Sequence, residues 1–217
     1  MAGTGGNSTH EAIELTVSAA EAGADYSLSV TPYYNKPTQQ GLFEHFQAVA
    51  RAVNLPIILY NVPGRTGCDL LNDTVVRLSQ IDNIVAIKDA TGDVERGAAL
   101  IEAVPDGFSV FSGDDATALE LMRRGGKGNV SVTANIAAGD MAAMCNLALA
   151  LEWEGAAEID ARLSDLNHLL FSEANPIPVK WAMAHRGMIE EGIRLPLTPL
   201  SEDCRAPLEQ AMEIYFA

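Results

Sequence analysis

The sequence predicts an α/β protein whose parallel sheet is followed by a helical C-terminal segment. Short apolar runs recur about every 20 to 30 residues, and helix-patterned stretches lie between them. No convincing strand pattern follows residue 150. Alternation of this kind is typical of βα units that share a parallel sheet. We therefore expect a partial β/α barrel over residues 1–150 and a helical domain over residues 151–217.

Five segments have the pattern of strands, and each leads into a helix-patterned segment. The strands are expected at 26–31, 57–62, 84–88, 108–112 and 129–133. The helices after them are expected at 38–52, 73–78, 94–104, 114–124 and from 140 onward. In the third strand the apolar run IVAI leads directly into Lys88, as in a strand that is buried on both faces.

The two ends of the chain carry helices. Ser8 and Glu11 form a capping box that opens an amphipathic helix ending at Gly23. The apolar face of this helix is expected to hold Ile13, Leu15, Val17 and Ala20. A strand should precede this helix in a βα repeat, but residues 1–3 are expected to be too few for one. After residue 150 we expect helices at 156–171, 177–188 and 202–216.

The composition of the chain argues against several classes of binding partner and site. The net charge is −15 and the 14 basic residues are spread thinly, which argues against nucleic acid or an anionic membrane, since both need clustered Lys and Arg. The three widely spaced cysteines predict neither a disulfide framework nor a metal site. No apolar run reaches the roughly 18 residues of a membrane span, and the start lacks the pattern of a signal peptide. A cytoplasmic protein is expected.

Reactive side chains gather after the predicted strands, where sites form in parallel α/β folds. They are Tyr33, Tyr34, Tyr60, Arg65, Lys88, Asp114, Asp115, Thr133 and Asn135. A desolvated lysine at such a strand end has a lowered pKa and acts as a Schiff-base nucleophile, or it extends to solvent with no catalytic role. On pattern alone both alternatives stay open for Lys88.

The other candidates also allow two interpretations. Arg65, in a Gly-Arg-Thr-Gly loop, suits either the grip of a substrate carboxylate or a surface ion pair. Tyr60 is either a proton relay or a structural hydrogen-bonding group. Asp114 and Asp115 are expected to serve as the N-cap and the first-turn charge of the following helix, in preference to a metal or acid/base site. Lys180 and the four histidines are expected to be structural.

A series of motifs, in order and at matching spacing along the whole chain, resembles the dihydrodipicolinate synthase family of pyruvate-dependent class I aldolases. The motifs are AGTGGNST, VTPYYNKPTQ, LYNVPGRTG, IVAIKDATGD, SGDD, VSVTAN and NPIPVKWA. The resemblance implies a (β/α)8 barrel with a C-terminal helical domain, assembled as a homo-oligomer, either a dimer or a tetramer. It also implies catalysis with no cofactor beyond a covalent lysine imine.

The resemblance assigns roles to the catalytic candidates. Lys88 would form the imine with pyruvate, and Tyr60 would relay protons. Tyr34 would complete that relay in the site of a neighbouring subunit. Arg65 would bind the carboxylate of the second substrate, L-aspartate semialdehyde. The activity would belong to lysine and diaminopimelate biosynthesis.

Five further positions match binding residues of the family. Val130 and Gly113 match positions that line the pyruvate pocket. Asn7, Glu11 and Tyr33 match positions used for feedback inhibition by lysine in the members that have it.

This sequence differs from the family pattern at its N-terminus. Family members carry roughly 70 residues before the position of Met1, about two βα units, including a GTTGE-like motif for the pyruvate carboxylate. We therefore expect an incomplete barrel with open strand edges. The alternatives are a catalytically silent, self-associating remnant of the family, an aldolase similar to N-acetylneuraminate lyase, and a longer natural protein whose start is missing from this chain.

Overall fold

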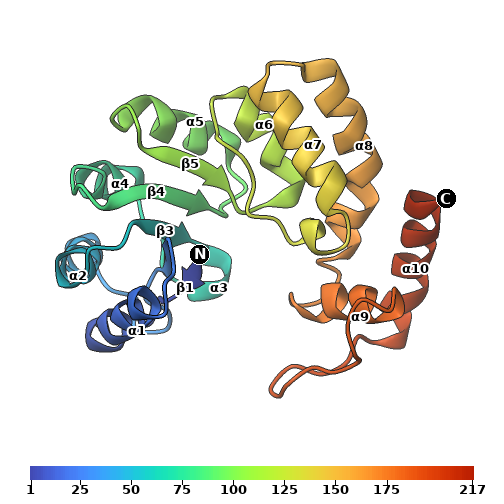
Figure 1. Cartoon of the computed structure of the whole chain (residues 1–217), viewed down its shortest axis with the longest axis horizontal. Helices are drawn as coiled ribbons and strands as arrows, with labels where there is room; N and C mark the ends of the chain where they lie inside the picture. The colour runs from blue at the N-terminus through green and yellow to red at the C-terminus, as the bar shows by residue number, and fades with distance from the viewer. The chain divides into compact units, whose positions relative to one another are not determined.

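The computed structural model describes all 217 residues, which form two compact units. The first unit spans Met1–Val130 and the second spans Ser131–Ala217 (Figure 1). This division falls before the boundary that we expected after residue 150. Helix α7 (Ala138–Leu149) packs extensively on α8 (Trp153–Leu169), which is why it groups with the helical unit.

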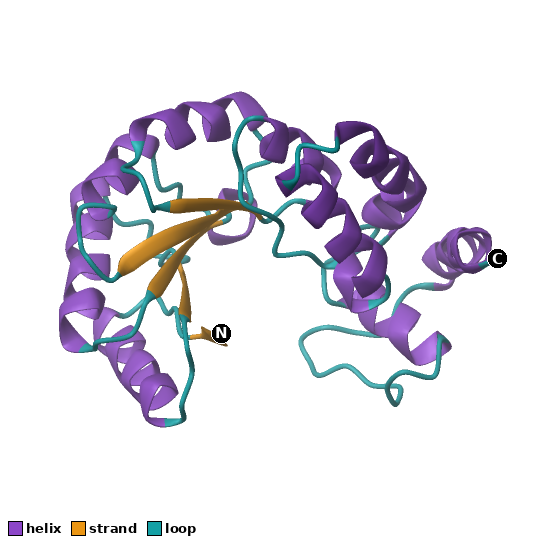
Figure 2. Cartoon of the chain, turned by 45° about the horizontal axis from the view of Figure 1, so that its top comes forward, coloured by secondary structure: helices purple, strands orange, loops and turns teal.

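The first unit is built on a five-stranded sheet in which every pair of neighbours is parallel and the strands follow the order of the chain. The strands are β1 (Ala2–Gly3), β2 (Ser27–Val30), β3 (Ile57–Asn61), β4 (Ile84–Asp89) and β5 (Ser109–Ser112). The helices are α1 (Thr9–Glu21), α2 (Gln39–Ala52), α3 (Pro63–Thr66), α4 (Asn72–Leu78), α5 (Val94–Ala103), the 3-10 turn η1 (Asp115–Thr117) and α6 (Ala118–Arg123). The long helices of this unit lie along one face of the sheet (Figure 2).

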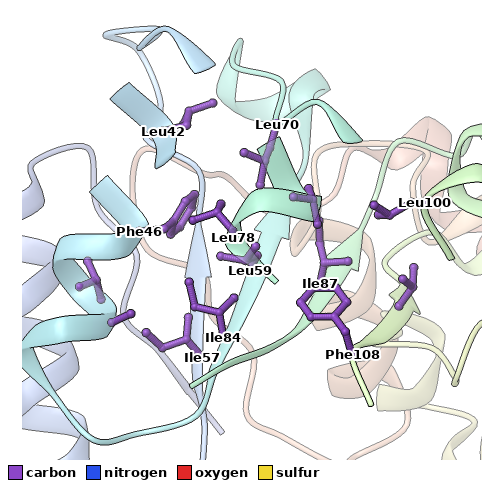
Figure 3. Close-up of a cluster of buried hydrophobic side chains, with 14 of the residues drawn as sticks. Leu42, Phe46, Ile57, Leu59, Leu70, Leu78, Ile84, Ile87, Leu100 and Phe108 are labelled. Atoms are coloured by element: carbon purple, nitrogen blue, oxygen red, sulfur yellow. The ribbon is translucent and has the colours of Figure 1, made fainter. Parts of the chain in front are cut away.

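The core of the first unit lies between the sheet and these helices. Leu59 of β3 and Ile87 of β4 pack there with Phe46 of α2, and all three are at most 1% exposed (Figure 3). Each such side chain contributes about 1.5–3 kcal/mol when it leaves water. Side chains on one face of each central strand are therefore buried against the helices, and the side chains on the opposite face lie outside this core.

Two of the expected strand assignments are wrong. Residues Ala2–Gly3 do form a strand, because both pair with β2 and the amide of Ala2 donates to the carbonyl of Tyr26 (2.9 Å). Conversely, 129–133 is no strand. It makes one parallel bridge, between Ser112 and Asn129, and then turns into the 3-10 segment η2 (Thr133–Asn135).

Helix α1 begins where the capping box predicts, since the hydroxyl of Ser8 accepts from the amide of Glu11 (3.5 Å). Its buried face differs from the apolar one that we expected. Leu15 is 48% exposed, whereas Thr16 is fully buried. Its hydroxyl donates to the carbonyl of Ala12 (2.6 Å) and lies 3.1 Å from the hydroxyl of Thr4. A short hydrogen-bonded side chain at this position allows close packing that a leucine would prevent.

The second unit is helical. It contains η2, α7, α8, α9 (Ile177–His185) and α10 (Glu202–Phe216). Its core includes Leu166, Leu170 and Leu208, each at most 1% exposed. Asp140 of α7 joins three helices, because its carboxylate accepts from Arg162 of α8 and from Tyr215 of α10, both at 2.9 Å.

One buried group of the first unit couples folding to pH. His45 of α2 is 5% exposed, its Nδ1 lies 2.9 Å from the hydroxyl of Thr9, and its Nε2 has no partner. Burial lowers the pKa of His45 from 6.5 to about 4. Below pH 6.5 this histidine takes up a proton in the unfolded chain but not in the folded chain. The free energy of unfolding is therefore highest above pH 6.5, and the protonation of His45 lowers it as the pH falls toward 4.

We expect this histidine to remove about 2 kcal/mol of unfolding free energy between pH 7 and pH 5. In His45→Gln that component of the pH dependence should disappear. Urea unfolding at the two pH values measures the effect. His10→Gln is the matched control, because His10 has an 81% exposed side chain on α1 and its replacement should leave the pH dependence intact. Equal pH dependence in His45→Gln and the parent would contradict the assignment.

Candidate functional site

The candidate site is a row of side chains on the face of the sheet opposite the helix-covered core. The strand register sets Val30 opposite Tyr60, Tyr60 opposite Lys88, and Lys88 opposite Phe111. Neighbouring strands of a sheet lie about 4.8 Å apart, so side chains abreast in this way are in contact. The Nζ of Lys88 accordingly lies 4.2 Å from the centre of the Tyr60 ring.

An irregularity in the pairing of β3 with β4 produces this row. Ile57 pairs with Ile84, but the next residue, Ile58, pairs with Ala86. The extra residue shifts the remaining register by one position. As a result Ile84 and Ile87 both pack in the core, and the side chain of Lys88 emerges on the opposite face.

Lys88 is half-buried at the carboxyl end of β4. Burial lowers the pKa of its ammonium, Arg65 lowers it further, and the carboxylate of Asp115 opposes both effects. A larger share of the amine is therefore neutral than in an exposed lysine, and the neutral amine is the nucleophile.

Tyr60 and Arg65 complete the charged surroundings of this lysine. Burial raises the pKa of the Tyr60 phenol, and the nearby Arg65 partly offsets the rise, so the phenol keeps its proton at neutral pH. Arg65 belongs to the single-turn helix α3, where we expected a flexible loop, and its side chain is exposed. A guanidinium held in this way can grip an incoming carboxylate.

Gly113 follows β5 and leaves room for the lysine chain. A Cβ at this position would lie 2.6 Å from Cε of Lys88 and 2.8 Å from Cβ of Ala90. Its amide also donates to the carbonyl of Asp89 (2.7 Å). Val130 lies at the end of the same unit, where its amide donates to the carbonyl of Ser112 (2.8 Å).

Asp115 is the residue whose role the sequence did not indicate. It lies in the first turn after β5, as we expected, but it is 2% exposed, accepts from Asn129 Nδ2 (2.7 Å) and acts on the charge of Lys88. Asp114 stands at the start of η1 without capping a backbone amide, and its carboxylate accepts from the hydroxyl of Thr117 (2.7 Å). An Asp-Asp pair after a strand shows no pattern that tells which of the two carboxylates is buried.

The remaining predicted residues gather at the loop after β2 and the start of α1. Tyr34 has a positive φ of 72°, its ring is 87% exposed, and its amide donates to the carbonyl of Thr66 (3.2 Å), the residue after Arg65. The side chain of Asn35 donates to the carbonyl of Asn7 (2.8 Å), and its backbone amide donates to the carbonyl of Tyr33 (2.8 Å). Glu11 lies exposed in the first turn of α1.

No group of three or more His, Cys, Asp or Glu side chains is arranged to hold a metal ion. The three cysteines are free thiols. None of the helices combines the length and the hydropathy that a bilayer crossing needs.

Comparison with known proteins shows which family this chain resembles in sequence. A model of the dihydrodipicolinate synthetase family matches residues 1–215. The 4-hydroxy-tetrahydrodipicolinate synthase of Marinobacter nauticus is 60% identical over 214 residues, which cover 98% of this chain and 73% of that protein. The corresponding synthase of Pseudomonas syringae pv. syringae is 58% identical over 212 residues, with the same two shares covered.

Solved structures give the same result. The crystal structure of the chloride-inhibited dihydrodipicolinate synthase from Acinetobacter baumannii, complexed with pyruvate, matches with a TM-score of 0.97 at 58% identity and covers 99% of this chain and 74% of that one. The lysine-bound enzyme from Cyanidioschyzon merolae matches with a TM-score of 0.95 at 42% identity, over 99% of this chain and 73% of that one.

The fold and the family together define a lyase of the aldolase type, and this chain holds an incomplete β/α barrel with a five-stranded parallel sheet. The chain belongs to the dihydrodipicolinate synthetase family. It spans about 73% of the length of the curated relatives described above. The expected family and fold class are thereby confirmed.

The electrostatic role of Asp115 is testable. In Asp115→Asn the carboxylate that favours the protonated lysine is gone, so the pKa of Lys88 should fall. The rate at which trinitrobenzenesulfonate modifies Lys88 at pH 7, followed by peptide mass spectrometry, should rise about threefold to tenfold.

Asp114→Asn is the matched control, because this neighbouring carboxylate is not among the groups that shift Lys88. Its rate should equal that of the parent. An unchanged rate in Asp115→Asn, with an unchanged melting curve, would show that Asp115 does not tune the lysine.

Proposed function

We propose that the protein condenses pyruvate with L-aspartate semialdehyde through an imine on Lys88. The observation that carries the proposal is the position of Lys88, half-buried at the carboxyl end of β4 with its Nζ 4.2 Å from the ring centre of Tyr60. The names of the relatives support the same reaction, because they are 4-hydroxy-tetrahydrodipicolinate synthases. They favour this function over an aldolase similar to N-acetylneuraminate lyase.

The chemistry follows from the protonation states of the site. The neutral amine of Lys88 adds to the ketone carbon of pyruvate, and the resulting carbinolamine loses water to form a cationic imine. This cation accepts the electrons that are released when the methyl group loses a proton. The enamine so formed then attacks the aldehyde carbon of the second substrate, whose oxygen takes up a proton as the imine on Lys88 forms again. Addition of water or of an amine to this imine releases the product and returns the lysine as an amine. No metal or organic cofactor takes part in these steps.

Tyr60 is suited to move protons during these steps, because its phenol keeps its proton at neutral pH and lies beside the amine. In our proposal Tyr34 completes the relay in the site of a neighbouring subunit. Its exposed ring, carried on a loop tied to Thr66, supports a role outside its own chain. The proposal therefore includes a homo-oligomer.

Arg65 is proposed to bind the carboxylate of the semialdehyde, because its exposed guanidinium lies close enough to affect the charges of Tyr60 and Lys88. Gly113 and Val130 are proposed to line the pyruvate pocket. Asn7, Glu11 and Tyr33 are proposed to form an inhibitory lysine site, and the contact of Asn35 with Asn7 supports this grouping. As part of lysine biosynthesis, the protein is proposed to act in the cytoplasm.

The imine can be trapped. Incubation with pyruvate and borohydride should add one reduced pyruvyl group to the protein, and peptide mass spectrometry should place it on Lys88. Lys88→Arg should give no adduct, because a guanidinium stays protonated and does not form this imine. Lys127→Arg, a change at an exposed lysine after α6, should give the parent adduct.

Absence of an adduct on the folded parent protein would count against retained imine chemistry. That result would favour the alternative of a catalytically silent member of the family.

If Arg65 binds the semialdehyde, its replacement should impair the condensation step but not the formation of the imine with pyruvate. Arg65→Met should lower kcat/KM for L-aspartate semialdehyde about 10- to 100-fold, since a charge-assisted bidentate pair contributes about 1.5–3 kcal/mol. The pyruvate adduct on Lys88 should still form. Steady-state kinetics with each substrate varied in turn measures the first effect. A loss confined to pyruvate would instead show that Arg65 serves the imine step.

A further inference from the structure

A cavity lies wholly within the helical unit. It has a volume of about 310 Å³ and lies between α9, the segment 191–200 and the first turn of α10. Cavities of this size hold small organic ligands. Its walls combine apolar side chains, among them Trp181, Ile193 and Leu200, with the charged side chains of Lys180, Glu191 and Arg205.

Helical geometry explains why α9 presents these groups together. Ile177, Lys180, Trp181 and Ala184 are spaced i, i+3, i+4 and i+7, so they form one stripe of the helix, and all four line the cavity. The core on the other side of α9 takes up Val179 and Ala182. The ring of Trp181 stacks on His185 with a centroid distance of 4.9 Å, which fixes an apolar wall.

The two cationic side chains of the cavity differ in their partners. Arg205 is anchored, since its Nε donates to the carbonyl of Leu200 (3.1 Å) and its Nη1 lies 2.7 Å from the carboxylate of Glu202. Lys180 is half-buried, and the structure pairs its ammonium with no carboxylate within 4.0 Å. A half-buried ammonium beside an apolar wall is suited to an anion that brings its own apolar body.

We propose that this cavity binds a small monocarboxylate with a flat apolar body, the carboxylate on Lys180 and the body against Trp181. Glu191 also lines the cavity, so a second negative charge on the ligand would meet a carboxylate. A cationic ligand would meet Lys180 and Arg205. A single anionic group is the charge that these walls match best.

The probe is 4-phenylbutyrate, added to the full chain, and its uncharged amide is the matched ligand control. In ¹⁵N spectra the indole N–H signal of Trp181 should shift in a saturable way, with a dissociation constant below about 1 mM. The signal of Trp153, identified by its loss in Trp153→Phe, should stay in place. The amide should bind at least about tenfold more weakly.

Two variants test the charges. Lys180→Met removes the ammonium and keeps an unbranched apolar chain out to Cε. It should weaken binding of 4-phenylbutyrate at least about tenfold, whereas Lys127→Met should change it less than about twofold. Glu191→Gln, a change on an exposed segment, should tighten binding about two- to fivefold.

Three results would overturn the proposal: no saturable shift of Trp181 at 10 mM 4-phenylbutyrate (about ten times the expected dissociation constant), equal binding of acid and amide, or unchanged binding by folded Lys180→Met. None of these measurements depends on the chemistry proposed for Lys88.

Discussion

The register between β3 and β4 is the constraint on which the candidate site depends. A parallel pair without its irregularity would carry the pairing of Ile57 with Ile84 forward and place Tyr60 opposite Ile87. Because side chains alternate between the faces of a strand, a slip of one residue would turn Lys88 toward the helices and Asp89 toward the site. Hydrophobic packing prevents this slip, since Leu59, Ile84 and Ile87 all have to be buried in the same layer.

The same layer determines the chemistry of the lysine. A sheet whose helix side is tightly packed presents a rigid opposite face, and the amine carried on it cannot withdraw into bulk water as an exposed lysine does. Asp115 and Arg65 then act on the lysine from two short helical segments, η1 and α3, which follow two different strands. Their effects on the pKa of Lys88 have opposite signs, because Asp115 raises it and Arg65 lowers it.

Much of this arrangement can be predicted from the sequence. Strand periodicity located β2 to β5, and the capping box located α1, because both depend on local patterns of apolar and capping residues. The placement of Lys88 at the end of a buried strand also followed from its IVAI run. Its role, with those of Tyr60 and Arg65, came from resemblance and is still a prediction, because pattern alone left each of them open.

The errors have a common cause. Ala2–Gly3 is a strand only because β2 offers it hydrogen-bonding partners, and 129–133 is no strand because it makes a single bridge with Ser112. The burial of Asp115 depends likewise on Asn129, which is fourteen positions away. Local pattern carries no information about such distant partners, so these features needed the tertiary structure.

Gly113 shows how narrowly the site constrains evolutionary change. Every codon change that replaces a glycine by another amino acid adds a Cβ atom, and here that atom would overlap both Lys88 and the backbone-anchored methyl of Ala90. Ala90 cannot move aside as the flexible end of a lysine can. Any single-codon substitution of this glycine therefore requires a shift of the backbone at Ala90, directly after β4, as well as a movement of the Lys88 side chain.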